Sequence, residues 1–181
     1  VETFQGGAQD NAAETNGDMT IDFGFVPALS IGSTVFYDVD NDGQQDPNNV
    51  LETGVSGVPV QLLYDANGDG DFNDAGESTP LLTTVTDANG NYFFGMLAPG
   101  NYQVVLPTPP ASAPVSSSNT DTADNDQDGD DNGSQTGSGT PITSPLIALT
   151  PNGETTNEPG QGGTADDASD TNGNMTVDFG V

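Results

Sequence analysis

Residues 38–46 read D-V-D-N-D-G-Q-Q-D, and this acidic stretch is the starting point for interpreting the whole chain. Asp38, Asp40 and Asp42 stand at alternate positions, and Gly43 follows them. Carboxylates held this close together repel one another strongly unless a cation lies between them. Ca²⁺ takes about six to eight oxygen ligands, and loops of the form D-x-[DN]-x-[DN]-G supply them around a sharp glycine turn. The stretch therefore predicts a calcium-binding loop.

The closing ligand of this loop departs from the common helix–loop–helix pattern. The twelfth position, where a bidentate glutamate is usual, holds Asn49, and the nearest glutamate is Glu52, three residues later. We therefore expect a cation-binding loop whose closing ligand is displaced. Its candidate ligands are Asp38, Asp40, Asp42, Gln44, Asp46 and Glu52.

Three further stretches carry acidic and amide side chains at similar spacing. The second loop has the expected spacing at its first, third, fifth and sixth places, and its glutamate falls at the thirteenth. The third has too few ligands to hold an ion alone, so we expect it to complete the shell of another loop. The fourth repeats the alternating aspartates and the glycine. Their candidate ligands are Asp65, Asn67, Asp69, Asp71, Asp74 and Glu77 in the second loop, Asp87 and Asn89 in the third, and Asp124, Asp126, Asp128 and Asp131 in the fourth.

A solvated turn is the ordinary alternative for each loop, because Asp, Asn and Gly are also the common turn residues. The recurrence of the pattern three times favours cations, since the chain has no other means of offsetting its charge. It contains no Lys, Arg or His and carries a formal charge of −28. We therefore expect several Ca²⁺ ions, and we expect much of the order of the chain to depend on them.

The same composition excludes several classes of function. Nucleic-acid binding needs Lys and Arg on the phosphates, and anionic membrane surfaces also attract basic residues. No apolar run approaches the length of a membrane-spanning helix, so we expect no membrane insertion. Without His, Cys, Lys or Arg, enzyme chemistry is restricted to paired carboxylates, as in glycoside hydrolysis. The carboxylates stand at cation-ligand spacing instead, so we expect no enzyme.

An internal repeat defines the domain organisation. Residues 1–25 align without gaps to residues 157–181, with 14 of 25 positions identical, at an offset of 156 residues. One complete unit therefore covers residues 26–181, and residues 1–25 are the tail strand of a preceding or neighbouring unit. Each copy ends in an alternating strand, which in the second copy carries Met175, Val177 and Phe179 on one face. The first copy is surplus, so it belongs either to a preceding tandem repeat or to a strand exchanged with a neighbouring molecule.

Between the two copies, short β-rich segments alternate with Gly, Pro and Asn turns. Strands are predicted over residues 29–37, 58–64, 81–86, 92–97, 101–106 and 146–149, with no helical periodicity. Asn89-Gly90 predicts a hairpin turn at 87–91, and residues 107–145 are expected to form a long loop partly ordered by metal. Several short strands with such turns predict an all-β fold, a β-sandwich with long calcium-binding loops.

Several runs resemble, in order, the B repeats of bacterial serine-aspartate-repeat surface adhesins (SdrD B-like), within the wider Cna-B, transthyretin-like group. They are S-I-G-S-T-V-F-Y-D-V-D-N-D-G-Q-Q-D from residue 30, G-V-S-G-V-P-V-Q-L-L from 54, T-T-V-T-D-A-N-G-N-Y-F-F from 83, L-A-P-G-N-Y-Q-V from 97, D-N-D-Q-D-G from 124 and D-T-N-G-N-M-T-V-D-F-G-V from 170. The resemblance implies a Greek-key type sandwich, stabilised by calcium, that serves as a stiff stalk. It also implies one ion held by Asp38, Asp40, Asp42, Asp46 and Glu52, with help from Asp87 and Asn89.

This chain differs from the family pattern at three points. Three residues are inserted before Glu52, the second acidic loop is longer than the family's short hairpin, and the absence of Lys excludes the Lys–Asn isopeptide crosslink of many Cna-B domains. The leading functional hypothesis is an extracellular, cell-surface repeat that forms a stalk or filament with copies of itself. The alternative is an adhesin that binds a glycan or protein through its loops. In that case Phe36, Phe72, Phe93 and Phe94 would be exposed anchors, whereas we expect most of them to be core residues.

Overall fold

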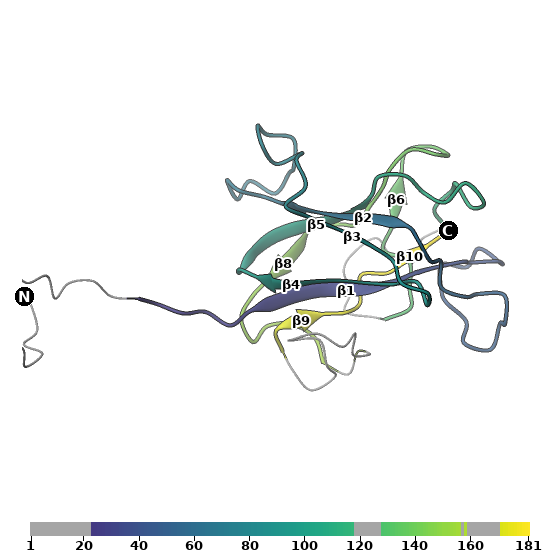
Figure 1. Cartoon of the computed structure of the whole chain (residues 1–181), viewed down its shortest axis with the longest axis horizontal. Coiled ribbons are helices and arrows are strands. Elements are labelled where there is room, and N and C mark those ends of the chain that lie inside the picture. The colour runs from purple at the N-terminus through teal and green to yellow at the C-terminus, as the bar shows by residue number, and fades with distance from the viewer. Residues whose placement is uncertain (1–22, 118–127, 157, 159–170) are drawn as a thin grey trace, which may run out of the picture.

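Two stacked β-sheets form the fold in the computed structural model, which describes residues 23–117, 128–156, 158 and 171–181 (Figure 1). The described residues contain no helix, and so none that could cross a membrane. Pro, Gly and Asn separate short runs of β-branched and aromatic residues, which favour strands. The strands are β1 (Leu29–Phe36), β2 (Pro59–Tyr64), β3 (Leu82–Val85), β4 (Asn91–Leu97), β5 (Gly100–Leu106), β6 (Ser134–Gln135), β7 (Ile142–Thr143), β8 (Ile147–Leu149), β9 (Gly173–Asn174) and β10 (Phe179–Gly180).

Strand order differs between the two sheets. One runs β10-β1-β4, with β9 also paired to β1, and the other runs β3-β2-β5-β7-β6, with β8 also paired to β5. β9 and β10 lie parallel to β1, whereas β4 is antiparallel to it, with Gly32 opposite Phe93. The prediction of an all-β sandwich is therefore confirmed.

The core lies between the sheets and is built from alternate residues of most strands. Each fully buried aliphatic or aromatic side chain contributes about 1.5–3 kcal/mol relative to an exposed position. β1 differs from the other strands because nearly all of its side chains are buried, on both faces. It is covered on both faces and flanked by paired strands on both edges. Major core residues are Leu29, Ile31, Val35, Val60, Leu62, Tyr92, Phe94, Tyr102, Val104, Leu106, Ile142, Ile147, Val177 and Phe179.

The six segments predicted as strands between the repeat copies all form strands, and no bound differs from the prediction by more than one residue. The predicted hairpin at 87–91 is wrong in its pairing. The turn itself forms, with Gly90 at φ 87°, but β3 pairs with β2 whereas β4 pairs with β1. The turn is wedged against Gly54, where an added Cβ would lie 1.6 Å from the Asn89 carbonyl oxygen. This packing makes the turn a corner between the two sheets rather than a hairpin.

Residues 107–145 were expected to form a long loop, and the described part of the segment contains two short strands. β7 pairs with β5, and β6 pairs with β7. Ile142 is fully buried and extends the core beneath β5. Ile142 is an isolated apolar residue in this polar segment, and such a pattern is too weak to predict a strand.

The closing segment was expected to be a half-buried strand, but the structure buries both of its faces. Thr176 and Asp178 are as deeply buried as Met175, Val177 and Phe179. β1 borders one side of the segment. On the other side, the backbone amides of Asn132 and Ser117 donate hydrogen bonds to the Asp178 and Gly180 carbonyl oxygens, both at 3.0 Å. Only Gly173–Asn174 and Phe179–Gly180 pair as regular strands.

The first copy of this segment is described only at its last residues, since residues 1–22 lie outside the described part. Phe23 and Phe25 are exposed, and the chain from Phe23 to β1 runs away from the sandwich (Figure 1). The repeat therefore places one copy of the same sequence in the core and leaves the end of the other exposed.

This pair of copies provides a matched test of the core. Phe179 is 0% exposed and its repeat counterpart Phe23 is 81% exposed. Phe179→Ala is expected to lower the free energy of unfolding by about 3–5 kcal/mol, because it leaves a cavity beside β1. Phe23→Ala is expected to change it by less than about 0.5 kcal/mol in the monomeric chain. Denaturant unfolding of both variants checks the expectation, and equal losses would contradict the assignment of the second copy to the core.

Candidate cation sites in the acidic loops

The first acidic loop begins where β1 ends and curls around the carboxylate of Asp38. Asp38 Oδ1 accepts a hydrogen bond from the Asn41 amide at 2.6 Å, and Oδ2 accepts one from the Gly43 amide at 2.8 Å. Asn41 and Gly43 have positive φ angles, which aim these amides inward. Carboxylate oxygens of Asp38, Asp40 and Glu52 lie within 4.8 Å of one another.

Glu52 reaches this group despite the three-residue insertion. The extra residues form two successive turns, with the Asn49 amide bonded to the Asp46 carbonyl and the Glu52 amide bonded to the Asn49 carbonyl. The buried Glu52 side chain accepts hydrogen bonds from the Asp46 amide at 2.6 Å and from Asn49 Nδ2 at 2.7 Å. The insertion therefore bulges outward and returns the displaced glutamate to the two aspartates.

The electrostatics of the first loop favour a bound positive charge. Partial desolvation, followed by the charges of Asp42, Glu52 and Asp38, raises the pKa of Asp40 above its usual value. The described residues include no Lys, Arg or His that could relieve this repulsion, because the whole chain has none. Asp42 and Asp46 lie outside the close group, and each caps a local turn by accepting an amide hydrogen bond two residues ahead.

The second acidic loop follows β2 and repeats the same backbone geometry. Asp65 accepts hydrogen bonds from the amides three and five residues ahead, Gly68 at 2.6 Å and Gly70 at 2.9 Å. A hydrogen bond from Asn101 Nδ2, the largest contribution, and these amides hold the pKa of Asp65 below its usual value. Carboxylate oxygens of Asp65, Asp69 and Glu77 lie within 4.8 Å of one another.

Glu77 supplies the clearest indication of a position that suits a cation in this loop. Its side chain is only 4% exposed, and Oε1 accepts hydrogen bonds from the Ala66 and Asn67 amides. Oε2 is buried without a hydrogen-bond partner. A buried anionic oxygen without a donor is strongly unfavourable unless a cation takes that place. An all-oxygen set of this kind suits a hard cation such as Ca²⁺.

The other predicted ligands of the second loop lie around this group. Asn67 Nδ2 donates to Asp69 Oδ2 at 3.1 Å and to Asp74 Oδ2 at 2.6 Å. Asp71 caps the next turn by accepting the Asn73 amide. Asn67 and Asp74 therefore neighbour the carboxylate group, whereas Asp71 is occupied by local backbone contacts.

The third loop does not join either carboxylate group in the described structure. Asp87 Oδ1 accepts hydrogen bonds from the Asn89 and Asn91 amides, and both Asp87 and Asn89 are exposed. The loop nevertheless packs beside the first one, through the contact of Asn89 with Gly54.

The fourth loop is described only from Asp128, since Asp124 and Asp126 lie outside the described residues. Asp131 is fully buried, and its two oxygens accept hydrogen bonds from the Gly133 and Gly180 amides and from the hydroxyls of Ser116 and Ser117. Through the Gly180 amide, Asp131 ties the loop to the closing segment.

Backbone hydrogen bonds also join the fourth loop to the first. The Gln45 amide donates to the Gly129 carbonyl at 2.7 Å, and the Asp131 amide donates to the Gly43 carbonyl at 2.8 Å. Gln44 pairs with Asp130 as an isolated antiparallel bridge. Two loops separated by more than eighty residues of sequence thus form one acidic surface.

The buried carboxylate of Asp178 was not among the predicted site residues. Its oxygens accept hydrogen bonds from Ser33 Oγ at 2.6 Å, the Thr34 amide at 3.0 Å and the Gly129 amide at 2.8 Å. Burial, followed by the charge of Asp128, raises its pKa to about 8, and burial raises the pKa of Asp131 to about 6. Strict alternation placed Asp178 on the polar face, so the sequence pattern gave no signal for its burial.

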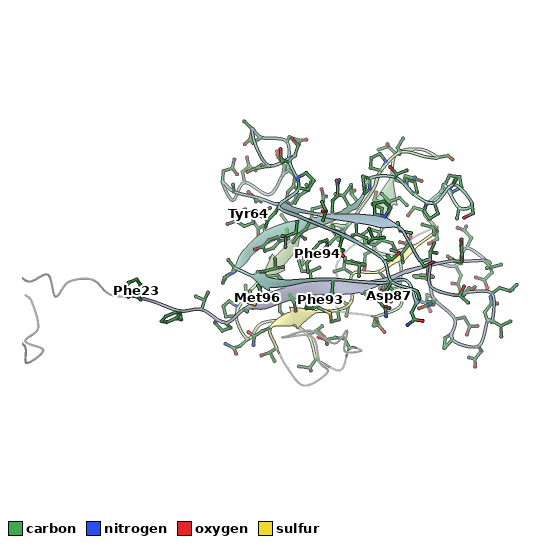
Figure 2. The ribbon with its side chains drawn as sticks, in the orientation of Figure 1. Phe23, Tyr64, Asp87, Phe93, Phe94 and Met96 are labelled. Atoms are coloured by element: carbon green, nitrogen blue, oxygen red, sulfur yellow. The ribbon has the colours of Figure 1, made fainter. Side chains whose placement is uncertain are left out.

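The acidic loops are divided between opposite ends of the sandwich. We call the end where β1 begins the N-terminal end, and the end where β1 and β10 finish the C-terminal end. The first and third loops and the described part of the fourth lie at the C-terminal end, and the second lies at the N-terminal end (Figure 1). Figure 2 accordingly shows Asp87 and Tyr64, which precedes Asp65, at opposite ends.

The proposed aromatic anchors do not form an exposed set. Phe36 and Phe94 are buried, as expected of core residues, so they cannot serve the adhesin alternative as exposed anchors. Phe72 and Phe93 are half-buried. β1 is buried on both faces, which covers Phe36, and burial alternates along β4, which places Phe94 on the covered face.

Comparison with known proteins gives a consistent family assignment. The model of the SdrD B-like domain matches residues 29–149. Similar proteins include Colossin-A of Dictyostelium discoideum, 39% identical over 58% of this chain and 1% of that protein. They also include a fibrinogen-binding protein of Staphylococcus epidermidis, 40% identical over 60% of this chain and 9% of that protein. Serine-aspartate repeat-containing protein C of Staphylococcus aureus (strain Newman) is 37% identical over 60% of this chain and 10% of that protein. The chain thus matches a small part of each relative's length.

The buried carboxyl of Asp178 predicts a pH dependence of stability in the presence of a chelator. Its pKa is about 8 in the folded state, against an ordinary value of 3.8, so the folded chain binds more protons than the unfolded chain between these values. The free energy of unfolding should therefore rise as the pH is lowered from 8 towards 4. Asp178→Asn should flatten this rise relative to the native chain. Urea unfolding at several pH values measures both slopes, and parallel slopes would contradict a neutral Asp178.

Proposed function

The chain belongs to the SdrD B-like domain family, and on that premise we propose that it is an extracellular structural repeat whose acidic loops bind calcium. In this role it forms part of a stalk or filament of a surface protein. The unpartnered, buried Oε2 of Glu77, beside Asp65 and Asp69, is the observation that carries the calcium assignment. The equivalent close group of Asp38, Asp40 and Glu52 supports a second ion.

Calcium suits these loops better than other common ions. Every nearby donor is a carboxylate, amide or backbone oxygen, because the chain has no His or Cys. Zinc and copper prefer sites that include imidazole or thiolate ligands, which this chain cannot provide. Magnesium demands a near-ideal octahedron and keeps several waters, whereas calcium accepts the irregular shell of a flexible loop. Extracellular calcium is present at concentrations that fill sites of modest affinity.

The shape of the unit suits a stalk. β1 begins at one end of the sandwich, where the chain enters from residue 28, and the closing segment finishes at the other end (Figure 1). Units of this kind that follow one another at the 156-residue repeat would align end to end. Residues 1–25 would then complete the preceding unit, either along one polypeptide or by strand exchange with a neighbouring molecule.

A second candidate function, adhesion to a ligand, has narrower support. One relative is named a fibrinogen-binding protein, but this chain matches only 9% of its length. The burial of Phe36 and Phe94 removes two of the aromatic anchors that the adhesin hypothesis used. The stalk role therefore accounts for more of the structure.

Calcium should stabilise the folded chain through Glu77. At a hundredfold excess over its dissociation constant, a calcium ion bound at one site raises the free energy of unfolding by about 2.7 kcal/mol. Glu77→Gln should lose most of the stabilisation that calcium gives through the second loop. In chelator the variant should be at least as stable as the native chain, because the substitution removes a buried negative charge. Thermal melting with calcium chloride and with EGTA measures both effects.

Glu154→Gln is the matched control for this variant. Glu154 accepts a hydrogen bond from the Thr150 amide at 2.6 Å and lies outside the four acidic loops. Its variant should keep the full response to calcium. A Glu77→Gln chain that responds to calcium as strongly as the control would contradict the assignment of an ion to the second loop.

Chelation should also soften an array of units. Removing calcium leaves the carboxylate groups of the loops unbalanced, so the loops at both ends of each unit should loosen. Small-angle X-ray scattering of a chain with several repeats should then show a shorter and broader distribution of lengths with EGTA than with calcium. Unchanged lengths and an unchanged melting temperature would contradict a stalk rigidified by calcium.

A further inference from the structure

An apolar groove lies at the N-terminal end of the sandwich, outside the acidic loops. It encloses about 360 Å³ and is lined mainly by carbon atoms of Tyr64, Leu81, Leu82, Met96 and Leu97. The groove faces solvent, because Leu81, Leu82 and Met96 are exposed. Figure 2 shows Tyr64 and Met96 at the end from which the segment with Phe23 extends.

Met96 combines two unusual features at the rim of this groove. Its φ angle is 61°, in the left-handed region that side chains other than glycine seldom adopt, and its side chain is 81% exposed. Glycine, which adopts such angles without strain, stands at the preceding position, Gly95, rather than at position 96. An exposed apolar side chain held in a strained backbone gains nothing within the unit, and such outliers point to function.

The C-terminal end of the sandwich exposes complementary apolar side chains. Val50 is 86% exposed and Leu51 is 64% exposed, at the outer turns of the first acidic loop, and Val39 is also exposed there. No ion pair between side chains can join two copies of this chain, since it has no cationic side chain. Apolar contact is therefore the direct means by which the ends of two units can attract each other.

The repeat brings these two ends together. Val181 lies at the C-terminal end, where its amide donates to the Phe36 carbonyl and its carbonyl accepts from the Asp38 amide, both at 3.0 Å. Phe25 is the repeat counterpart of Val181, so only residues 26–28 separate a closing segment from the β1 that follows it. Three residues span roughly 10 Å, which places the first acidic loop of one unit close to the groove of the next.

We propose that the turn carrying Val50 and Leu51 docks into the groove beside Met96 of the following unit. The occupant of the groove is thus a second copy of this chain, arranged head to tail. A contact between two different surfaces repeats without closing, so it extends an array into a filament. The inference rests on the proposed function, since it requires units placed end to end, and it identifies the surfaces that join them.

Disulfide trapping in a two-unit chain, residues 1–181 continued by a second copy of residues 26–181, tests this contact. The chain has no cysteine, so Leu51→Cys in the first unit and Met96→Cys in the second introduce the sole pair of thiols. The control pairs Leu51→Cys with Val85→Cys, an exposed position at the other end of β3. In millimolar calcium the docked pair should form its disulfide at least about tenfold faster than the control pair, because docking raises the effective concentration of the thiols.

Met96→Gly provides a second measurement that separates docking from folding. Glycine relieves the left-handed backbone, so the melting temperature of the 181-residue chain should stay the same or rise. The same change in both units of the two-unit chain should broaden its length distribution in small-angle scattering, because the contact is lost.

Equal trapping of the two thiol pairs, or an unchanged length distribution for Met96→Gly, would overturn the docking. If calcium still raised the melting temperature in that case, the proposed calcium role would stand without the docking. Fast trapping in a chain that shows no response to calcium would instead support the docking and contradict the calcium role.

Discussion

A chain with 28 acidic side chains and no basic ones must accommodate every negative charge without an internal ion pair. The structure uses several means in different places. The carboxylates of Asp38 and Asp65 accept hydrogen bonds from backbone amides of tight loops, and the carboxylate of Asp131 accepts four hydrogen bonds in the interior. The raised pKa of Asp178 favours its neutral form inside the sandwich. The buried Oε2 of Glu77 receives no hydrogen bond from the described residues, so the proposed calcium role follows from the same constraint as the fold.

β1 connects this charge balance to the architecture. The strand is buried on both faces, pairs with strands on both edges and leads directly into the first acidic loop. The closing segment lies beside it and receives hydrogen bonds from the fourth loop. Order in the acidic loops is therefore coupled to the centre of the core, and ions bound at the ends would stiffen the unit along its length. In the proposed chain of repeats the same ends would form the junctions.

The sequence predicted the fold well because its signals were local and repeated. Alternating apolar residues located the strands, and the glycine-containing acidic loops located two groups of converging carboxylates. Pairing was less predictable: the Asn89-Gly90 turn forms, yet its flanking strands enter different sheets because the turn packs against Gly54. The burial of Asp178 and Ile142 depends on a segment more than thirty residues away in sequence, and no local pattern encodes such a contact. The return of Glu52 to Asp38 depends on the shape of an insertion, which spacing rules alone do not give.

A crystal structure of the chain grown in millimolar calcium chloride tests the central claim most directly. The account predicts a strong spherical peak bound by Glu77 Oε2 and by carboxylate oxygens of Asp65 and Asp69, at calcium–oxygen distances of about 2.3–2.6 Å. A fully ordered second loop, with water alone at that position and a protein donor on Glu77 Oε2, would contradict it.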